Sequence, residues 1–168
     1  MANNDMLIKL YALDFNWNSI HEQVESDVTI RKPIGPDRPQ LLSWAEIHFP
    51  ALWVGELQQA LANMPCSCFV AQRGSSLLGF ACYDATALGY FGPLGVVENS
   101  RGAGIGRSLT EACLLEMRLK GYGYAIVGMA GSADFYRKVA DAVEIPDSYP
   151  GIYRATLELA EIPNGHQG

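Results

Sequence analysis

The segment Leu94–Gly106 constrains the fold of this chain more than any other. An apolar run typical of a β-strand, Leu94–Val97, leads into a glycine-rich turn, and an amphipathic helical pattern begins directly after the turn. Such a turn places unpaired backbone N–H groups at the positive end of a helix, where a phosphate or diphosphate binds well. Gly102, Gly104 and Gly106 carry no Cβ atom that would keep an anion from the backbone. The sequence therefore predicts a strand–loop–helix anion site.

Two common phosphate loops do not fit this segment. A dinucleotide fingerprint with glycines at 102 and 104 requires a third at 107, where Arg107 stands. A Walker A loop ending at Gly106 requires a glycine at 101 and a lysine at 107, and both positions are arginine. The pattern that does fit is [RQ]-x-x-G-x-[GA], from Arg101 to Gly106.

With its preceding strand, this hexapeptide resembles the acyl-CoA diphosphate loop of the GNAT superfamily of N-acetyltransferases. A second segment supports the resemblance: Tyr124–Ala130 is typical of a strand, and Ala133–Lys138 resembles the family's next helix. The resemblance implies that Tyr136 on this helix faces the coenzyme sulfur. It also implies a set of acetyl-CoA-binding residues: Leu94, Gly95, Val96, Val97, Arg101, Gly102, Ala103, Gly104, Ile105, Gly106, Arg107, Ser108 and Tyr136.

The resemblance implies an α/β (α+β) fold: a mixed, mainly antiparallel central sheet of about seven strands, flanked by helices. Two parallel strands, ending at Val97 and Ala130, are expected to splay apart and admit the coenzyme. We expect a single domain over residues 1–162, with a β-α extension at 1–27 that covers a sheet edge and the core at 28–162. The polar tail 163–168 is expected to be disordered.

Periodicity and breakers locate the other elements. We expect strands at 6–13, 28–31, 68–72, 77–84, 90–97 and 152–159, and helices at 16–26 and 107–120. Pro50 should divide the helical stretch 39–64 in two because it lacks a backbone N–H. Gly92-Pro93 should distort its strand, since proline cannot donate a ladder hydrogen bond.

Composition limits the function classes. The chain has 168 residues and a formal charge of −6, without a basic run, which disfavours a nucleic-acid partner. No segment has the length and apolar character of a membrane span, and no signal-peptide pattern begins the chain, so we expect a cytoplasmic protein without a membrane partner. Cys66, Cys68, Cys82 and Cys113 are expected to be free thiols. No metal-binding pattern is present in the sequence.

The reaction implied by the resemblance needs an acid that protonates the leaving thiolate. It also needs a base or a water chain that removes a proton from the amine. A lysine-type amine is mostly protonated at neutral pH, because its pKa is about 10.4. Tyr136 can donate a proton to the leaving thiolate. The stretch 89–93 holds no acid where many family members carry a glutamate. Asp84 is the nearest candidate base; Glu98, Glu46 and His48 follow, and a water chain without a single base stays open.

We therefore expect an acyl-CoA-dependent N-acyltransferase (EC 2.3.1.-) that moves an acetyl group from acetyl-CoA to a primary amine of a small molecule by direct attack on the thioester. A protein or peptide amine is the alternative acceptor. A non-catalytic acyl-CoA sensor is the alternative from another class. A homodimer is a further expectation of the resemblance.

Overall fold

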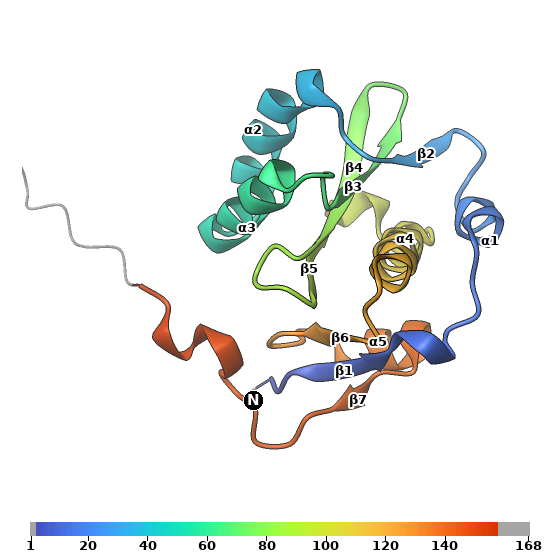
Figure 1. The fold of residues 1–168 in the computed structure, drawn as a ribbon. Helices are drawn as coiled ribbons and strands as arrows, with labels where there is room; N and C mark the ends of the chain where they lie inside the picture. The colour runs from blue at the N-terminus through green and yellow to red at the C-terminus, as the bar shows by residue number, and fades with distance from the viewer. Residues whose placement is uncertain (1–2, 158–168) are drawn as a thin grey trace, which may run out of the picture.

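A computed structural model describes residues 3–157 of the chain (Figure 1). The strands are β1 Met6–Lys9, β2 Val28–Arg31, β3 Cys68–Arg73, β4 Ser76–Tyr83, β5 Tyr90–Val96, β6 Tyr124–Val127 and β7 Val143–Glu144. The α-helices are α1 Trp17–Glu22, α2 Arg38–His48, α3 Ala51–Ala62, α4 Ile105–Lys120 and α5 Ala133–Ala140. Short 3₁₀ helices are η1 Leu10–Ala12, η2 Gly35–Asp37, η3 Glu98–Ser100 and η4 Gly151–Ala155.

The strands form one mixed sheet of seven strands in the order β2-β3-β4-β5-β6-β1-β7. Every neighbouring pair is antiparallel except β5 and β6, which are parallel. The predicted fold class, a mainly antiparallel sheet with two parallel strands and flanking helices, is confirmed. The single parallel pair lies near the centre of the sheet, and the cavity described below is lined by residues of both strands.

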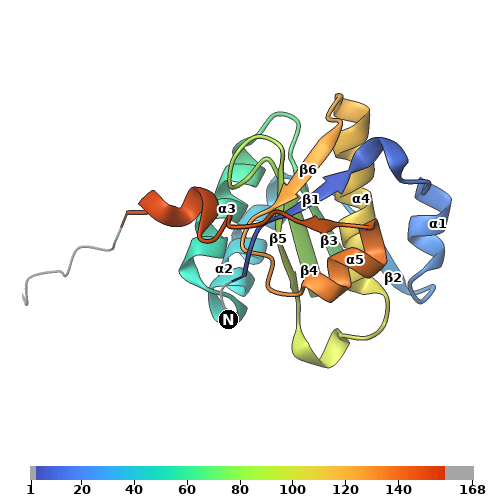
Figure 2. The ribbon, with the colours of Figure 1, turned by 90° about the horizontal axis from the view of Figure 1, so that it is seen from below.

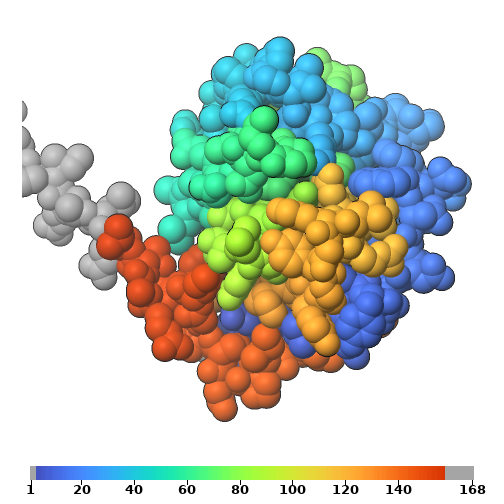
Figure 3. Space-filling model, viewed as in Figure 1, coloured from blue at the N-terminus to red at the C-terminus, as the bar shows by residue number. Residues whose placement is uncertain are grey.

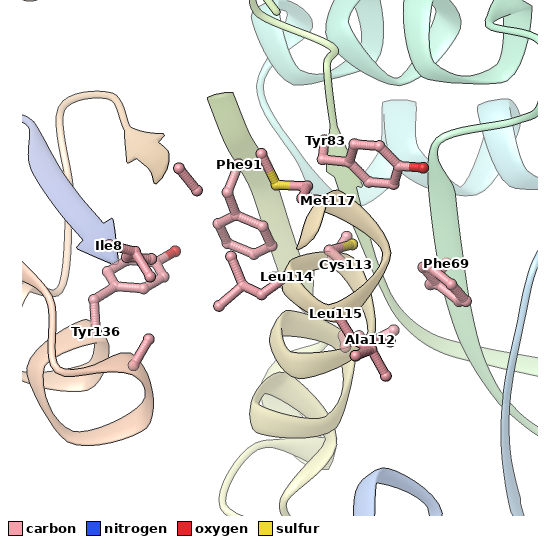
Figure 4. Packing of buried hydrophobic residues seen from close by; sticks show 14 of the residues in the cluster. Ile8, Phe69, Tyr83, Phe91, Ala112, Cys113, Leu114, Leu115, Met117 and Tyr136 are labelled. Atoms are coloured by element: carbon pink, nitrogen blue, oxygen red, sulfur yellow. The ribbon is translucent and has the colours of Figure 1, made fainter. Parts of the chain in front are cut away.

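Helices cover both faces of the sheet (Figure 2). One core lies between the sheet and α1, α4 and α5, and a second lies under α2 and α3. The fully buried Phe91 of β5 lies beside Leu114 and Met117 of α4 (Figure 4). Burial of apolar side chains stabilises the fold by about 25 cal/mol per Å² removed from water. The two cores hold β5 firmly from both sides.

Local signals explain most element boundaries. Pro50 caps α3 and separates it from α2, as predicted. Gly121 ends α4 in the left-handed conformation that favours glycine, with φ of 111°. The hairpin of β3 and β4 turns at Gly74, where φ is also positive. In β5, Gly92 and Pro93 lie opposite Cys82 of β4, which gives the predicted irregularity of this strand.

Two predicted strands were wrong or incomplete, and one short strand was not predicted. The strand expected at 6–13 ends at Lys9 and continues as η1. The strand expected at 152–159 is not formed: η4 covers Gly151–Ala155, and residues 158–159 lie outside the described part of the chain, as does the predicted tail 163–168. The two-residue strand β7 was not predicted.

The position of β1 explains the missing C-terminal strand. β1 pairs antiparallel with β6 on one side and with β7 on the other. The N-terminal segment, which was predicted to cover a sheet edge, therefore supplies an interior strand of the sheet. Because β1 pairs with β6, no place beside β6 is left for a C-terminal strand. Tyr153 of η4 instead packs near the cavity described below.

Candidate active site

A wedge opens between β5 and β6. The two strands pair only at Tyr90–Ile126 and Phe91–Val127, and beyond these pairs they separate. Val97 donates its N–H to Leu78 O of β4 over 2.9 Å. Because antiparallel hydrogen bonds alternate along a strand, the N–H groups of Leu94 and Val96 point away from β4 and into the wedge. The wedge thus offers main-chain donors to an extended ligand.

On the β6 side, the side chain of Asp5 explains why the two strands separate. Asp5 is buried, and its Oδ1 accepts the N–H of Met129 over 2.8 Å. Met129 has a positive φ of 42°, so the chain turns directly after β6 ends at Val127. Asp5 thus holds the segment after β6 in a path that leaves β5.

The glycine-rich loop reaches the open end of this wedge. Gly104 caps α4 with φ of 80°, and Ser108 donates the first intrahelical hydrogen bond to Gly104 O over 3.0 Å. The N–H groups of Ile105, Gly106 and Arg107 precede that bond and have no partner within the helix. They form the positive helix end that the sequence predicted.

The packing around the loop requires glycine at position 104 but not at position 106. A Cβ atom on Gly104 would lie 2.5 Å from the carbonyl oxygen of Gln23, just after α1. Gly104 is therefore required by the packing of the N-terminal segment against the loop. A Cβ atom on Gly106 would meet Phe135 and Val96 at 3.8 Å, which is ordinary contact. Gly106 can accept a side chain without disturbing its neighbours.

One cavity of about 890 Å³ joins the loop, the wedge and the helices α3 and α5. Arg101, Arg107 and Lys138 supply positive charge to the loop end. The opposite end, under α2 and α3, contains the carboxylate of Glu56. The volume falls within the range of about 300–1,000 Å³ that is usual for small-molecule and cofactor sites.

Tyr136 of α5 lines the cavity. Its ring packs edge-on against Phe91, with the ring centroids 5.9 Å apart (Figure 4). It also packs edge-on against Phe135, with the ring centroids 5.1 Å apart. Burial raises the pKa of its phenol. In the described part of the chain its hydroxyl makes no hydrogen bond, so the proton is available to a ligand in the cavity.

Glu56 is held at the other end by two hydroxyl groups. Both Thr86 and Tyr153 donate to Oε2 of Glu56, the latter over 2.9 Å. Burial, together with the nearby Glu56 carboxylate, raises the pKa of Tyr153 to about 12, so this phenol stays a donor at neutral pH. The three side chains come from α3, the β4–β5 loop and η4, and Figure 3 shows these segments adjoining. The second oxygen, Oε1, accepts no hydrogen bond from residues 3–157.

A sequence model of the acetyltransferase (GNAT) family matches residues 36–140, well over half of the chain. The chain belongs to the GNAT acetyltransferase family. No curated protein sequence matches the chain. Among solved structures, a GCN5-related glucosamine N-acetyltransferase region of a fungal multi-domain GH3 β-N-acetylglucosaminidase is similar, with a TM-score of 0.70, 14% identity and coverage of 86% of this chain and 20% of that one.

Two bacterial structures show the same fold. GCN5-related N-acetyltransferases from Sphaerobacter thermophilus and Kribbella flavida give TM-scores of 0.58 and 0.56, with 17% and 12% identity. Each alignment covers 86% of this chain, and 50% and 55% of the respective neighbour. The chain thus spans between a fifth and about half of the length of these structures, and the likeness establishes the GNAT fold alone.

Most residues that the sequence assigned to the GNAT coenzyme site line the cavity. These are Leu94, Gly95, Val96, Arg101, Gly102, Gly104, Gly106, Arg107 and Tyr136. Arg101 also donates from Nε to Val96 O, and Arg107 donates from Nε to Glu111, so both guanidinium groups are held at the loop.

Four other assigned residues do not line the cavity. Ser108 is fully buried and donates its hydroxyl to Ile20 O over 2.8 Å. Ile105 is a core residue because it lies on the inward face of α4. The N–H of Val97 is already paired in the sheet, and Ala103 is exposed outside the cavity.

Asp84, the first candidate base in the sequence analysis, lies outside the cavity. Its side chain is 1% exposed and is not part of the cavity lining. It accepts hydrogen bonds from Gly89 N, Lys120 Nζ and Tyr122 Oη at 2.6–2.9 Å. The hydrogen bond from Lys120 raises the pKa of that ammonium group. Asp84 therefore braces the β4–β5 loop, which carries Thr86.

Sequence reasoning missed Glu56, although a signal existed. Glu56 lies three and four residues after Trp53 and Leu52, so the three side chains share one face of α3. An acidic residue on an apolar helix face is unusual unless it has a partner or a function. The partners Thr86 and Tyr153 come from distant segments, and no local pattern connects them to α3.

The remaining predictions about ions, thiols and membranes concern residues 3–157. All four cysteines are free, and three of them are buried, as predicted. In this range no three His, Cys, Asp or Glu side chains are grouped so that they could hold a metal ion. None of the described helices is long and apolar enough to cross a lipid bilayer.

Proposed function

We propose that this GNAT chain is an acyl-CoA-dependent N-acyltransferase that transfers an acetyl group from acetyl-CoA to the primary amine of a small molecule. One observation carries the proposal: a single cavity is lined by the glycine-rich loop, by Tyr136 and by the carboxylate of Glu56. A donor with a diphosphate at one end and a thioester at the other fits this set of groups.

The residues present suit such a donor. The diphosphate binds the N–H groups of Ile105, Gly106 and Arg107, with Arg101 and Lys138 nearby. The unpaired N–H groups of Leu94 and Val96 bind the amide groups and carbonyl of the donor in the wedge, as an added strand would. A main-chain donor that stabilises developing charge on a carbonyl oxygen contributes about 3–4 kcal/mol in comparable acyl-transfer sites.

The ammonium form of the acceptor first loses one proton to solvent, because only the neutral amine has a lone pair for attack. The transfer then requires two further proton movements. The amine nitrogen forms a bond to the acetyl carbon and the carbon–sulfur bond breaks. Glu56 accepts a proton from the nitrogen, whose protons become acidic as the new bond forms. Tyr136 donates a proton to the leaving sulfur and regains one from solvent. Glu56 thus replaces Asp84 as the proposed base, while Tyr136 keeps the role of acid.

The variant Glu56→Gln tests this proposal. Glutamine keeps an oxygen that accepts the hydroxyl groups of Thr86 and Tyr153 but cannot take up the amine proton. We expect kcat to fall about 100-fold, with the Kd of acetyl-CoA nearly unchanged. Release of the coenzyme thiol measures the rate, and calorimetry measures the Kd.

Glu46→Gln is the matched control, because Glu46 is exposed on α2 and does not line the cavity. Equal rates in the parent and Glu56→Gln would exclude Glu56 as the base. Tight acetyl-CoA binding without amine-dependent thiol release from the parent protein would instead favour the sensor.

A further inference from the structure

The two ends of the cavity differ in charge. Its three basic side chains, Arg101, Arg107 and Lys138, belong to the loop, α4 and α5. At the end under α2 and α3, Glu56 is the single acidic side chain of the lining, and the only basic candidate there is His48. A positively charged group binds beside Glu56, whereas a carboxylate finds no lysine or arginine at this end.

The two side-chain hydroxyl groups at this end already donate their protons to Glu56. The hydroxyl groups of Thr86 and Tyr153 both donate to Oε2 of Glu56, and their oxygen atoms lie 3.2 Å apart. This leaves Oε1 of Glu56 as the principal acceptor for a ligand. A ligand with many hydroxyl groups would leave most of them without partners, and unpaired buried polar groups cost about 1–3 kcal/mol each.

The rest of this end is apolar and aromatic. Phe49 and Trp53 stack with ring centroids 5.3 Å apart and an angle of 20° between the rings. The Phe49 ring lies against Gly95 of β5, where a Cβ atom would approach it to 2.6 Å. Leu52 lines the same cavity and is 54% exposed. An exposed leucine in a cavity lining is positioned to pack against a bound molecule.

From this arrangement we infer that the acceptor is a monoamine with an apolar, preferably aromatic, body: its ammonium group binds Oε1 of Glu56 and its body packs on Leu52 and Trp53. The inference rests on the proposed function. A polyamine finds no second acidic side chain in the lining, and an amino acid finds no lysine or arginine for its carboxylate at this end. An amino sugar finds the hydroxyl groups of Thr86 and Tyr153 already donating to Glu56.

A panel of four amines tests the inference: phenethylamine, methylamine, spermidine and glucosamine, each with acetyl-CoA. We expect phenethylamine to give the highest kcat/KM, by at least about tenfold over the other three, because a matched apolar surface discriminates by this order. A higher value for spermidine or glucosamine would overturn the inference and leave the proposed function standing. Transfer to none of the four would overturn both.

Two exposed positions give a matched pair of variants. Leu52→Ser should lower kcat/KM for phenethylamine about tenfold and leave the value for methylamine nearly unchanged. Ile47→Ser is the control, because Ile47 is 78% exposed on α2 and lies outside the cavity lining. An equal loss for both amines in Leu52→Ser, or the same loss in Ile47→Ser, would overturn the inference.

Discussion

At the scale of single residues, the conformation of the glycine-rich loop was predictable from the sequence, whereas the surroundings of the candidate acid–base groups were not. The main-chain cradle at Gly102–Arg107 follows from local chain geometry, so a short pattern is enough to find it. The side chains of Ile105 and Ser108 lie on the inward face of α4, so Ile105 can offer the coenzyme only its main-chain N–H and Ser108 has no free hydroxyl to offer. Glu56 was missed because its partners, Thr86 and Tyr153, are far away in sequence. A carboxylate's role depends on such partners, which a local motif does not encode.

Tyr136→Phe tests the acid. Burial raises the pKa of Tyr136, so its protonated form persists to higher pH than that of an ordinary phenol near 10. The proton supply to sulfur therefore does not decline between pH 7 and 10, while the fraction of neutral amine rises. We expect kcat/KM of the parent to increase over this range.

The phenylalanine variant keeps the packing against Phe91 and Phe135 but has no proton to give. Its kcat should be about 100-fold lower at each pH, with the Kd of acetyl-CoA almost the same. Rates equal to those of the parent over the whole range would show that Tyr136 serves packing only.

At the scale of elements, the wedge between β5 and β6 has two causes. One is local to β5, and the other is a contact between residues far apart in the sequence. The distortion of β5 was predictable, because Gly92-Pro93 cannot complete the ladder. The departure of the chain after β6 was not predictable, because Asp5 acts on Met129 across most of the sequence. The wrongly predicted strand at 152–159 has a similar explanation, since β1 occupies the place beside β6.

Asp5→Ala tests the long-range cause. The variant leaves Met129 N–H without its buried acceptor, and a hydrogen bond to a charged group contributes about 1.5–3 kcal/mol. We expect the free energy of unfolding in urea to fall by about this amount and acetyl-CoA to bind more weakly. Asp5→Asn, which keeps an acceptor oxygen, should restore most of both quantities. If alanine and asparagine gave the same acetyl-CoA affinity as the parent, Asp5 would not shape the wedge.

At the scale of the whole molecule, the fold class and strand number were predictable because strand and helix patterns alternate clearly. The position of β1 inside the sheet was not, because nothing in a four-residue apolar strand identifies its neighbours. Its place matters for function: α1 follows it and brings Gln23 against Gly104. A substitution at Gly104 would therefore disturb packing and coenzyme binding together, so Gly104 is a poor test of the site.

Gly106 offers the most direct test of the central claim, that the loop holds the coenzyme diphosphate. Gly106→Asp adds an acid in the first turn of α4, which helix electrostatics favours by about 0.3–1 kcal/mol, but it sets a negative charge against the diphosphate. Gly106→Ala is the control, with ordinary contacts and no charge. Calorimetric titration with acetyl-CoA should give similar Kd values for the parent and the alanine variant. The Kd of the aspartate variant should be at least about 100-fold higher, while its melting temperature stays close to that of the parent. Equal affinity in all three proteins would contradict the account.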